Sequence, residues 1–210
     1  MDRVPRLVIG VTGEFGTGYA VRLLELLAAT PIETHVVMCS CARRGIRSET
    51  GRDPADVISM ADRTYGEWNQ AARISSGSFL TLGMIVAPCS PRSLGSIALG
   101  YANTLIHRAA DVTMKEGRPL VLVVPARRIE EVDGGHVARL EQVPGVRVTS
   151  APPEAPVDRV DGLLVEILAG FDAYHDSLDG GVGLGHNGSR ATSRPSTQRR
   201  ERDREHRRDQ

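Results

Sequence analysis

Glycines and hydroxyl-bearing residues cluster where a short apolar run ends near the N-terminus. The run Arg6–Val11 leads into Thr12-Gly13-Glu14-Phe15-Gly16-Thr17-Gly18. Glycines at a strand-to-helix turn let backbone N–H groups close around a phosphate, and the start of the next helix adds partial positive charge. The segment is neither a G-x-G-x-x-G fingerprint nor a Walker loop. We interpret it as a candidate phosphate site, with a tight turn that needs glycine for positive φ as the alternative.

A second polar segment follows the apolar run Met84–Ala87. It reads Pro88-Cys89-Ser90-Pro91-Arg92-Ser93-Leu94-Gly95. Two hydroxyl groups, a guanidinium and a predicted helix start would together form an anion cradle. In the alternative interpretation, Ser90 only caps the helix and Arg92 is solvated.

Lys115 is the only lysine among 26 basic residues. A lone lysine in an arginine-rich chain indicates a need for a compact ammonium group at that position. Asp111 lies one helical turn before it, so an ordinary surface ion pair would also explain the lysine.

The cysteines and histidines do not have the spacing of metal ligands. Cys39 and Cys41 lack a second ligand pair, and the six histidines show no recurrent spacing, so no metal site is predicted. Three cysteines in a chain without an export signal argue against a disulfide framework. We expect Cys39 and Cys89 to act as small buried apolar residues. No G-x-S-x-G elbow supports hydrolase chemistry.

Alternating strands and helices would position these segments. Apolar runs predict strands at 6–11, 35–38, 84–87, 120–124 and 146–149. Helical spacing predicts helices at 19–29, 93–98, 104–115 and 160–171, and a further helix that follows the strand at 35–38 and ends at 46. Residues 52–69 favour neither state. Strands that are apolar throughout indicate a parallel sheet covered on both faces. The sequence therefore predicts a doubly wound α/β fold with ligands at the carboxyl ends of its strands.

Composition limits the class of protein. Of 210 residues, 26 are Lys or Arg and 26 are Asp or Glu, so the formal net charge is zero and nucleic-acid binding is not favoured. No long apolar stretch predicts a membrane span, and the N-terminus lacks a signal-peptide pattern, so we expect a cytoplasmic protein. Residues 175–210 are rich in glycine and then in arginine, which predicts a disordered tail after a folded domain at 1–174.

Several longer segments together resemble the flavin prenyltransferase family of the UbiX/Pad type. The resemblance covers residues 6–124 strongly and 145–172 more weakly. The segments that carry it are Ile32-Glu33-Thr34-His35-Val36-Val37-Met38, Glu49-Thr50, Ile74-Ser75-Ser76-Gly77-Ser78-Phe79, Thr81-Leu82-Gly83-Met84, Pro88-Cys89-Ser90, Arg108-Ala109-Ala110-Asp111-Val112, Lys115-Glu116 and Arg118-Pro119-Leu120-Val121-Leu122.

This resemblance implies a flavodoxin-like, Rossmann-like three-layer sandwich. It implies a homo-oligomer, commonly a dodecamer, that holds FMN between subunits. The reaction that it implies joins the dimethylallyl group of dimethylallyl phosphate to N5 and C6 of reduced FMN. The prenylated FMN would then serve a partner decarboxylase of the UbiD type.

The resemblance also implies roles for individual residues. Glu49 would lie near the prenyl carbons and Lys115 would hold the prenyl phosphate, because an allylic cation and its leaving group need opposite fixed charges. The positions implied to contact FMN are Gly13, Glu14, Phe15, Gly16, Cys39, Ser90, Pro91, Arg92, Ser93 and Arg108.

The chain departs from the family pattern at three places. Glu14-Phe15 stand where the family has Ala-Ser, and Pro125-Ala126 stand where it has an Arg-Glu pair with a catalytic glutamate. A Tyr-His-x-Pro loop is missing before the last helix, where the chain has residues 152–156. These departures keep two alternatives open: an FMN-binding homologue that has lost prenyl transfer, and a flavin-dependent decarboxylase of the same superfamily.

Overall fold

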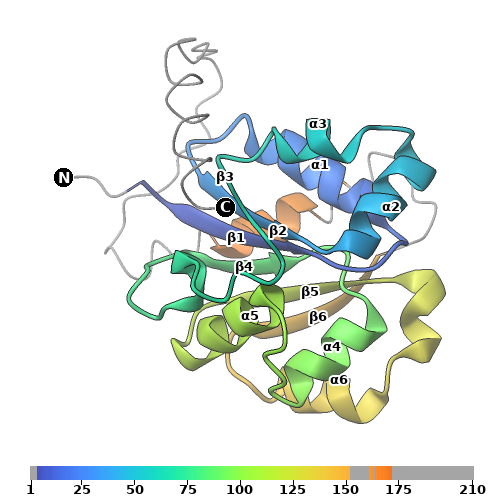
Figure 1. Ribbon diagram of the computed structural model, residues 1–210. Helices are drawn as coiled ribbons and strands as arrows, with labels where there is room; N and C mark the ends of the chain where they lie inside the picture. The colour runs from blue at the N-terminus through green and yellow to red at the C-terminus, as the bar shows by residue number, and fades with distance from the viewer. Residues whose placement is uncertain (1–3, 152–160, 163, 172–210) are drawn as a thin grey trace.

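Strands and helices alternate along the computed structural model, which describes residues 4–151, 161–162 and 164–171 (Figure 1). In chain order the elements are β1 (Arg6–Val11), α1 (Thr17–Leu27), β2 (Glu33–Met38), α2 (Ser40–Thr50), α3 (Pro54–Ile58), β3 (Arg63–Tyr65), η1 (Arg73–Ser75), β4 (Gly83–Val86), α4 (Pro91–Ala98), α5 (Leu105–Lys115), β5 (Leu120–Pro125), η2 (Ala126–Glu131), α6 (Gly134–Glu141) and β6 (Val146–Ala151). Residues 161–162 and 164–171 are also helical.

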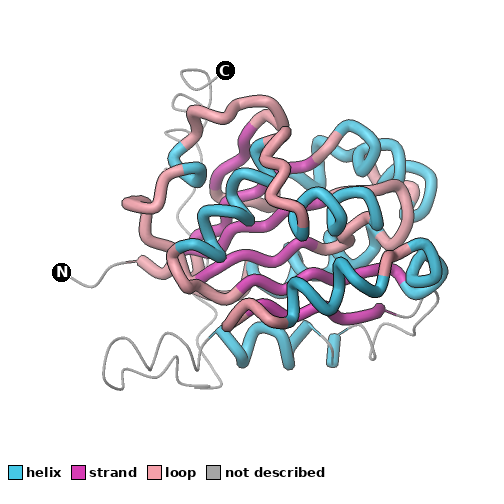
Figure 2. The backbone as a smooth tube through the Cα atoms, turned by 90° about the horizontal axis from the view of Figure 1, so that it is seen from below, coloured by secondary structure: helices cyan, strands magenta, loops and turns pink. Residues whose placement is uncertain are grey.

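The six strands form one sheet in the order β3-β2-β1-β4-β5-β6, and every pair is parallel. Figure 2 shows the strands in magenta, side by side among the helices. The chain first adds β2 and β3 on one side of β1, and then adds β4, β5 and β6 on the other. The order therefore reverses between β1 and β4. In such sheets the crevice for ligands lies outside the carboxyl ends of the strands at this reversal. The predicted doubly wound α/β fold is confirmed.

Helices cover both faces of the sheet. Because parallel crossovers are right-handed, the change of direction between β1 and β4 places the two sets of helices on opposite faces. Figure 1 shows α1, α2 and α3 on one side of the strands and α4, α5 and α6 on the other. Arg22 of α1 binds Asp161 at 2.6 Å, so the last helical segment returns to the face of α1. Burial from both sides explains why β4 and β5 consist of buried residues throughout.

Besides the 3-10 helices η1 and η2, the structure adds α3, β3 and α6, which the sequence pattern does not indicate. Residues 52–69 contain α3 and the three-residue edge strand β3, which pairs only with β2. Helix α6 begins with two glycines, which oppose helix formation, but Asp133 caps it by accepting the N–H of Gly135 at 2.7 Å. The predicted tail at 175–210 lies outside the described residues.

Candidate functional site

The turns after β1 and β4 are joined at the carboxyl edge of the sheet. The N–H and the hydroxyl of Thr12 both donate to the carbonyl of Pro88, at 3.0 and 3.2 Å. The same hydroxyl accepts the N–H of Ser90 at 2.9 Å. A side chain at Gly13, where φ is 87°, would also press on Ser90. The two polar segments singled out in the sequence therefore lie side by side, at the point where the strand order reverses.

Ser90 caps α4, as the alternative interpretation of this segment predicts. Its Oγ accepts the N–H of Ser93 at 3.2 Å and donates to the Ser93 hydroxyl at 3.1 Å. Pro91 occupies the first turn and Arg92 is exposed beside it. The cap places two hydroxyls and a guanidinium at the start of a helix, so capping and anion binding are compatible at this turn.

Glu49 reaches the start of α1 from the last turn of α2. Its carboxylate accepts the N–H groups of Gly16 and Thr17 at 3.0 and 2.7 Å and the Thr17 hydroxyl at 2.7 Å. Gly16, the residue that precedes α1, has no capping side chain of its own. Glu49 thus supplies the helix cap from 33 residues away. The N–H groups of the candidate phosphate site are thus bonded to a carboxylate of the chain itself.

Helix α2 is close enough to make this contact because Gly45 faces the first loop. A Cβ atom at Gly45 would overlap the carbonyl oxygen of Glu14. Arg44, next to Gly45, donates from Nε to the Glu14 carboxylate at 2.9 Å. Glu49 and burial also raise the pKa of Tyr19, burial being the larger cause. Helix α2 therefore contacts the first loop at Glu14, Gly16 and Thr17.

Phe15 and Glu14, which differ from the family pattern, each have a partner. The guanidinium carbon of Arg128 lies 5.2 Å from the centre of the Phe15 ring. Arg128 belongs to η2, the segment that follows β5 and begins at Ala126. Glu14 is bound by Arg44, as described above. The segment after β5, where Ala126 replaces the glutamate of the family pattern, thus contacts the first loop, where Glu14-Phe15 replace Ala-Ser.

Cys39 lies in the turn between β2 and α2, beside the first loop. Its N–H donates to the carbonyl of Val11 at 3.0 Å, and its Sγ accepts the N–H of Ala42 at 3.1 Å. The structure joins Cys39 to Cys41 in a disulfide. Cys39 is buried as expected, but the expectation that it is only a small apolar residue is wrong, because it is bonded to Cys41. An i, i+2 pair can be bonded locally without a disulfide framework. Cys89 is a free, fully buried thiol, as expected.

Lys115 and Arg108 are placed by α5. Both donate to the same carboxylate oxygen of Asp111, at 2.8 and 3.1 Å, which confirms the predicted surface pair. Lys115 is the last residue of α5, just before β5 begins, so it lies toward the amino ends of the strands. There it lines a cleft of about 320 Å³ with Ile97, Leu99, Met114, Arg139 and Leu140. The structure does not bring Lys115 and Glu49 together within one chain.

His107 near the start of α5 is not indicated by the sequence. Its pKa is lowered, mainly by burial and further by the positive charge of Arg92. Its buried Nδ1 has no hydrogen-bond partner among the described residues. A single histidine in a helix has no motif around it by which the sequence could have identified it.

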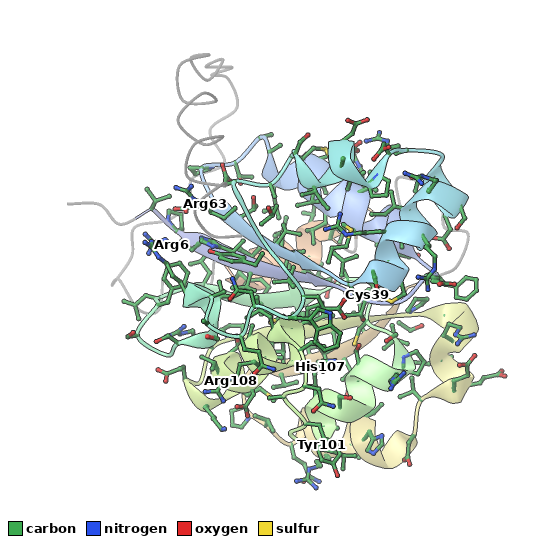
Figure 3. All side chains as sticks on the ribbon, viewed as in Figure 1. Arg6, Cys39, Arg63, Tyr101, His107 and Arg108 are labelled. Atoms are coloured by element: carbon green, nitrogen blue, oxygen red, sulfur yellow. A yellow bond between two sulfur atoms is a disulfide. The ribbon has the colours of Figure 1, made fainter. Side chains whose placement is uncertain are left out.

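Figure 3 shows Cys39 toward the carboxyl ends of the strands, whereas Arg6 and Arg63 lie toward their amino ends.

The part of the chain that the structure describes gives no support for a metal site or for a helix that spans a membrane. It contains no group of three or more His, Cys, Asp and Glu side chains that could hold a metal ion. None of its helices is both long and apolar enough to span a membrane.

The sequence is similar to a known protein family and to curated relatives. A family model described as Flavoprotein matches residues 1–166. A probable UbiX-like flavin prenyltransferase of Streptomyces sp. (strain D7) is 42% identical over 173 residues, which cover 80% of this chain and 86% of the relative. The flavin prenyltransferase UbiX of Escherichia coli (strain K12) is 43% identical over 149 residues, or 70% and 77% of the two chains.

Solved structures agree with these relatives. The fold matches AnUbiX (PadA1) in complex with FMN and dimethylallyl pyrophosphate, with a TM-score of 0.74 and 31% identity over 90% of this chain and all of that one. It also matches a dodecameric FMN-dependent UbiX-like decarboxylase from E. coli O157:H7, with a TM-score of 0.65, 36% identity and the same coverage. A cypemycin decarboxylase, 15% identical with a TM-score of 0.58, shares the fold.

Proposed function

The chain belongs to the Flavoprotein family, and on this premise we propose that it is a UbiX-like flavin prenyltransferase that binds FMN at the carboxyl edge of its sheet. The observation that carries the proposal is the joining of the turns after β1 and β4. Together these turns bring backbone N–H groups of Gly16 and Thr17, which bind the Glu49 carboxylate in this structure, to the same edge as two hydroxyls and a guanidinium at the start of α4. These donors suit a ligand with a phosphate and a polar ring system.

Residues of three turns would hold FMN. They are Gly13, Glu14, Phe15 and Gly16 after β1, Cys39 after β2, and Ser90, Pro91, Arg92 and Ser93 after β4, with Arg108 as a further candidate. Gly13 and Gly16 have positive φ, and Gly13 closely approaches Ser90, so bulkier residues would alter the crevice. The relative solved with FMN bound supports FMN as the ligand.

Transfer of a dimethylallyl group requires that the leaving phosphate and the developing allylic charge are both stabilised. Reduced FMN, when bound, supplies the nucleophilic ring atoms. Glu49 supplies a carboxylate at the crevice, and Lys115 supplies an ammonium that can bind the phosphate of dimethylallyl phosphate. Because the two lie toward opposite edges of the sheet in one chain, the ammonium must come from a second subunit. The dodecameric relative supports such an assembly.

A partner would consume the product. Prenylated FMN is useful only to an enzyme that binds it, and we propose a UbiD-type decarboxylase as that recipient. We further propose the cytoplasm as the location. Both statements rest on the family to which the chain belongs.

Loss of prenyl transfer with retained FMN binding is the second candidate function, and a specific feature favours it. Ala126 provides no carboxylate after β5, and Arg128 is stacked on Phe15. The donors at the start of α4, Ser90, Arg92 and Ser93, have no such defect. A flavin-dependent decarboxylase remains the third candidate, supported by the dodecameric relative, which is described as an FMN-dependent decarboxylase.

An anaerobic reaction with reduced FMN and dimethylallyl phosphate tests the proposal. We expect the extracted flavin to gain the mass of a dimethylallyl group less one hydrogen, because the group replaces hydrogen on the flavin. A mixture without dimethylallyl phosphate is the control. A separate titration compares oxidised FMN with riboflavin, which lacks the phosphate. FMN binding without prenylated product, even for Ala126→Glu, would favour the second candidate. Equal affinity for riboflavin would refute the assigned phosphate contacts.

A further inference from the structure

Cys39 and Cys41 occupy the first turn of α2 in an arrangement suited to reversible oxidation. Their Cα atoms are 5.4 Å apart, within the range that a disulfide requires. Both residues belong to the same turn, with Cys39 as the N-cap and Cys41 in the helix. The bond can therefore form or open while the backbone of this turn stays in place.

The helix start also favours the chemistry of thiol exchange. Sγ of Cys39 accepts the N–H of Ala42, and the unpaired N–H groups at a helix N-terminus stabilise a thiolate. Cys41 is half-buried, whereas Cys39 is 4% exposed. An incoming thiol thus reaches Cys41 more easily, and Cys39 is the better-stabilised leaving group.

The third cysteine provides an internal contrast. Cys89 is fully buried, and burial strongly raises the pKa of its thiol. A buried neutral thiol reacts slowly, because the thiolate is the nucleophile. Reactivity in this chain is therefore confined to the pair in α2.

We propose that Cys39 and Cys41 form a redox-active pair that exchanges electrons with dithiol reductants. A thiolate of the reductant attacks Sγ of Cys41, the bond between the two cysteines breaks, and Cys39 leaves as a thiolate beside the Ala42 N–H. The second thiol of the reductant then attacks the mixed disulfide and releases Cys41. The protein gains two electrons and two protons, and the reductant becomes a cyclic disulfide.

Thiol counting in the native holoprotein tests this exchange. The purified protein is equilibrated with dithiothreitol or with graded mixtures of reduced and oxidised glutathione. Free thiols are then alkylated, and the protein is weighed by mass spectrometry after denaturation. We expect three free thiols under reducing conditions and one, Cys89, under oxidising conditions, with the same midpoint from both directions. The oxidised protein should be lighter by two hydrogen atoms and carry no glutathione.

Two single variants serve as controls. Cys41→Ser and Cys39→Ser each leave one cysteine of the pair, so neither can form the internal disulfide. We expect the surviving thiol to stay free or to bind glutathione, without loss of two hydrogens. Three free thiols in the wild-type protein at every ratio of reduced to oxidised glutathione would overturn the proposal. So would a disulfide that dithiothreitol cannot open in the native protein, or glutathione that persists on the wild type. These readouts count thiols and protein mass rather than bound or prenylated FMN, so they stand apart from the test of the proposed function.

Discussion

At the scale of single residues, Arg92 is the cation best placed to meet an anionic ligand at the α4 start. It is exposed, so its guanidinium is available to a ligand. We expect Arg92→Ala to weaken FMN binding by about 1–3 kcal/mol, the range for a hydrogen bond to a charged group. Fluorescence titration would measure the loss, with Arg73→Ala, at another exposed arginine, as the control. Unchanged affinity would show that Arg92 is only solvated.

A second prediction concerns His35, which lies in the core outside the candidate site. Burial is the main reason that its pKa falls from 6.5 to about 4, with Glu33 opposing and Arg6 and Arg63 adding to the shift. Its Nδ1 lies 2.8 Å from the Tyr65 hydroxyl. Between these two pH values the unfolded chain binds a proton on His35 and the folded chain does not. Stability should therefore fall as the pH drops from about 6.5 to 4.

The His35 contribution is measured by urea unfolding across that pH range. One proton corresponds to a slope of at most about 1.4 kcal/mol per pH unit. Carboxylates also titrate in acid, so the wild type must be compared with His35→Gln, which cannot take up this proton. We expect a shallower slope for the variant. Identical slopes would mean that His35 is protonated in the folded protein.

At the scale of elements, the contact between α2 and the first loop depends on Gly45. A methyl group there would overlap Glu14, whereas one at Gly18 of α1 would meet no atom within 4 Å. We expect Gly45→Ala to destabilise the protein by about 1–3 kcal/mol through overpacking. Gly18→Ala should be neutral or should stabilise by up to about 1 kcal/mol, because alanine favours helix. Urea unfolding compares the pair, and equal effects would contradict the described packing.

The strands and the long helices of this fold are readable from local pattern, and its shorter elements are not. β4 and β5 are apolar throughout because both faces of the sheet are covered, so their pattern is strong. β3 has only three residues and one neighbour, and its Arg-Thr-Tyr sequence contains no apolar run. α6 starts against the preference of Gly134 and Gly135 and depends on its cap and on packing against α4.

The candidate site, too, can be read from local sequence pattern only in part. Gly13 and Ser90 are identified by their place after predicted strands, because carboxyl ends of parallel strands converge. The cap that Glu49 provides for α1 depends on how α2 packs, which local pattern does not contain. The bond between Cys39 and Cys41 likewise needs the conformation of a particular turn.

At the scale of the whole molecule, the separation of Glu49 and Lys115 makes a prediction about subunits. If a working site takes Glu49 from one chain and Lys115 from another, Glu49→Ala and Lys115→Ala subunits are each inactive alone. Mixed oligomers should contain some sites with both native residues, so part of the prenyl transfer returns. Co-expression with two affinity tags isolates the mixed species, and prenylated FMN is measured by mass.

Controls distinguish complementation from simple mixing. Combining the two variants after separate assembly should give no activity unless subunits exchange. Co-expression of a double variant with either single variant should also stay inactive, because no site can then contain both residues. A mixed oligomer as inactive as its parents would indicate that both residues act within one chain, or that one of them is dispensable.

The order of the strands also dictates when this protein can fold. The central pair joins Leu7 to Gly83, and the last described helix returns to that pair, where Phe171 packs against Gly83. The interior of the molecule thus cannot close until residues from the beginning and the end of the described chain are both present. Such distant partners slow folding relative to proteins built from neighbouring segments. During synthesis, the apolar strands made first must wait, with the edge of β1 open, for the residues that cover them.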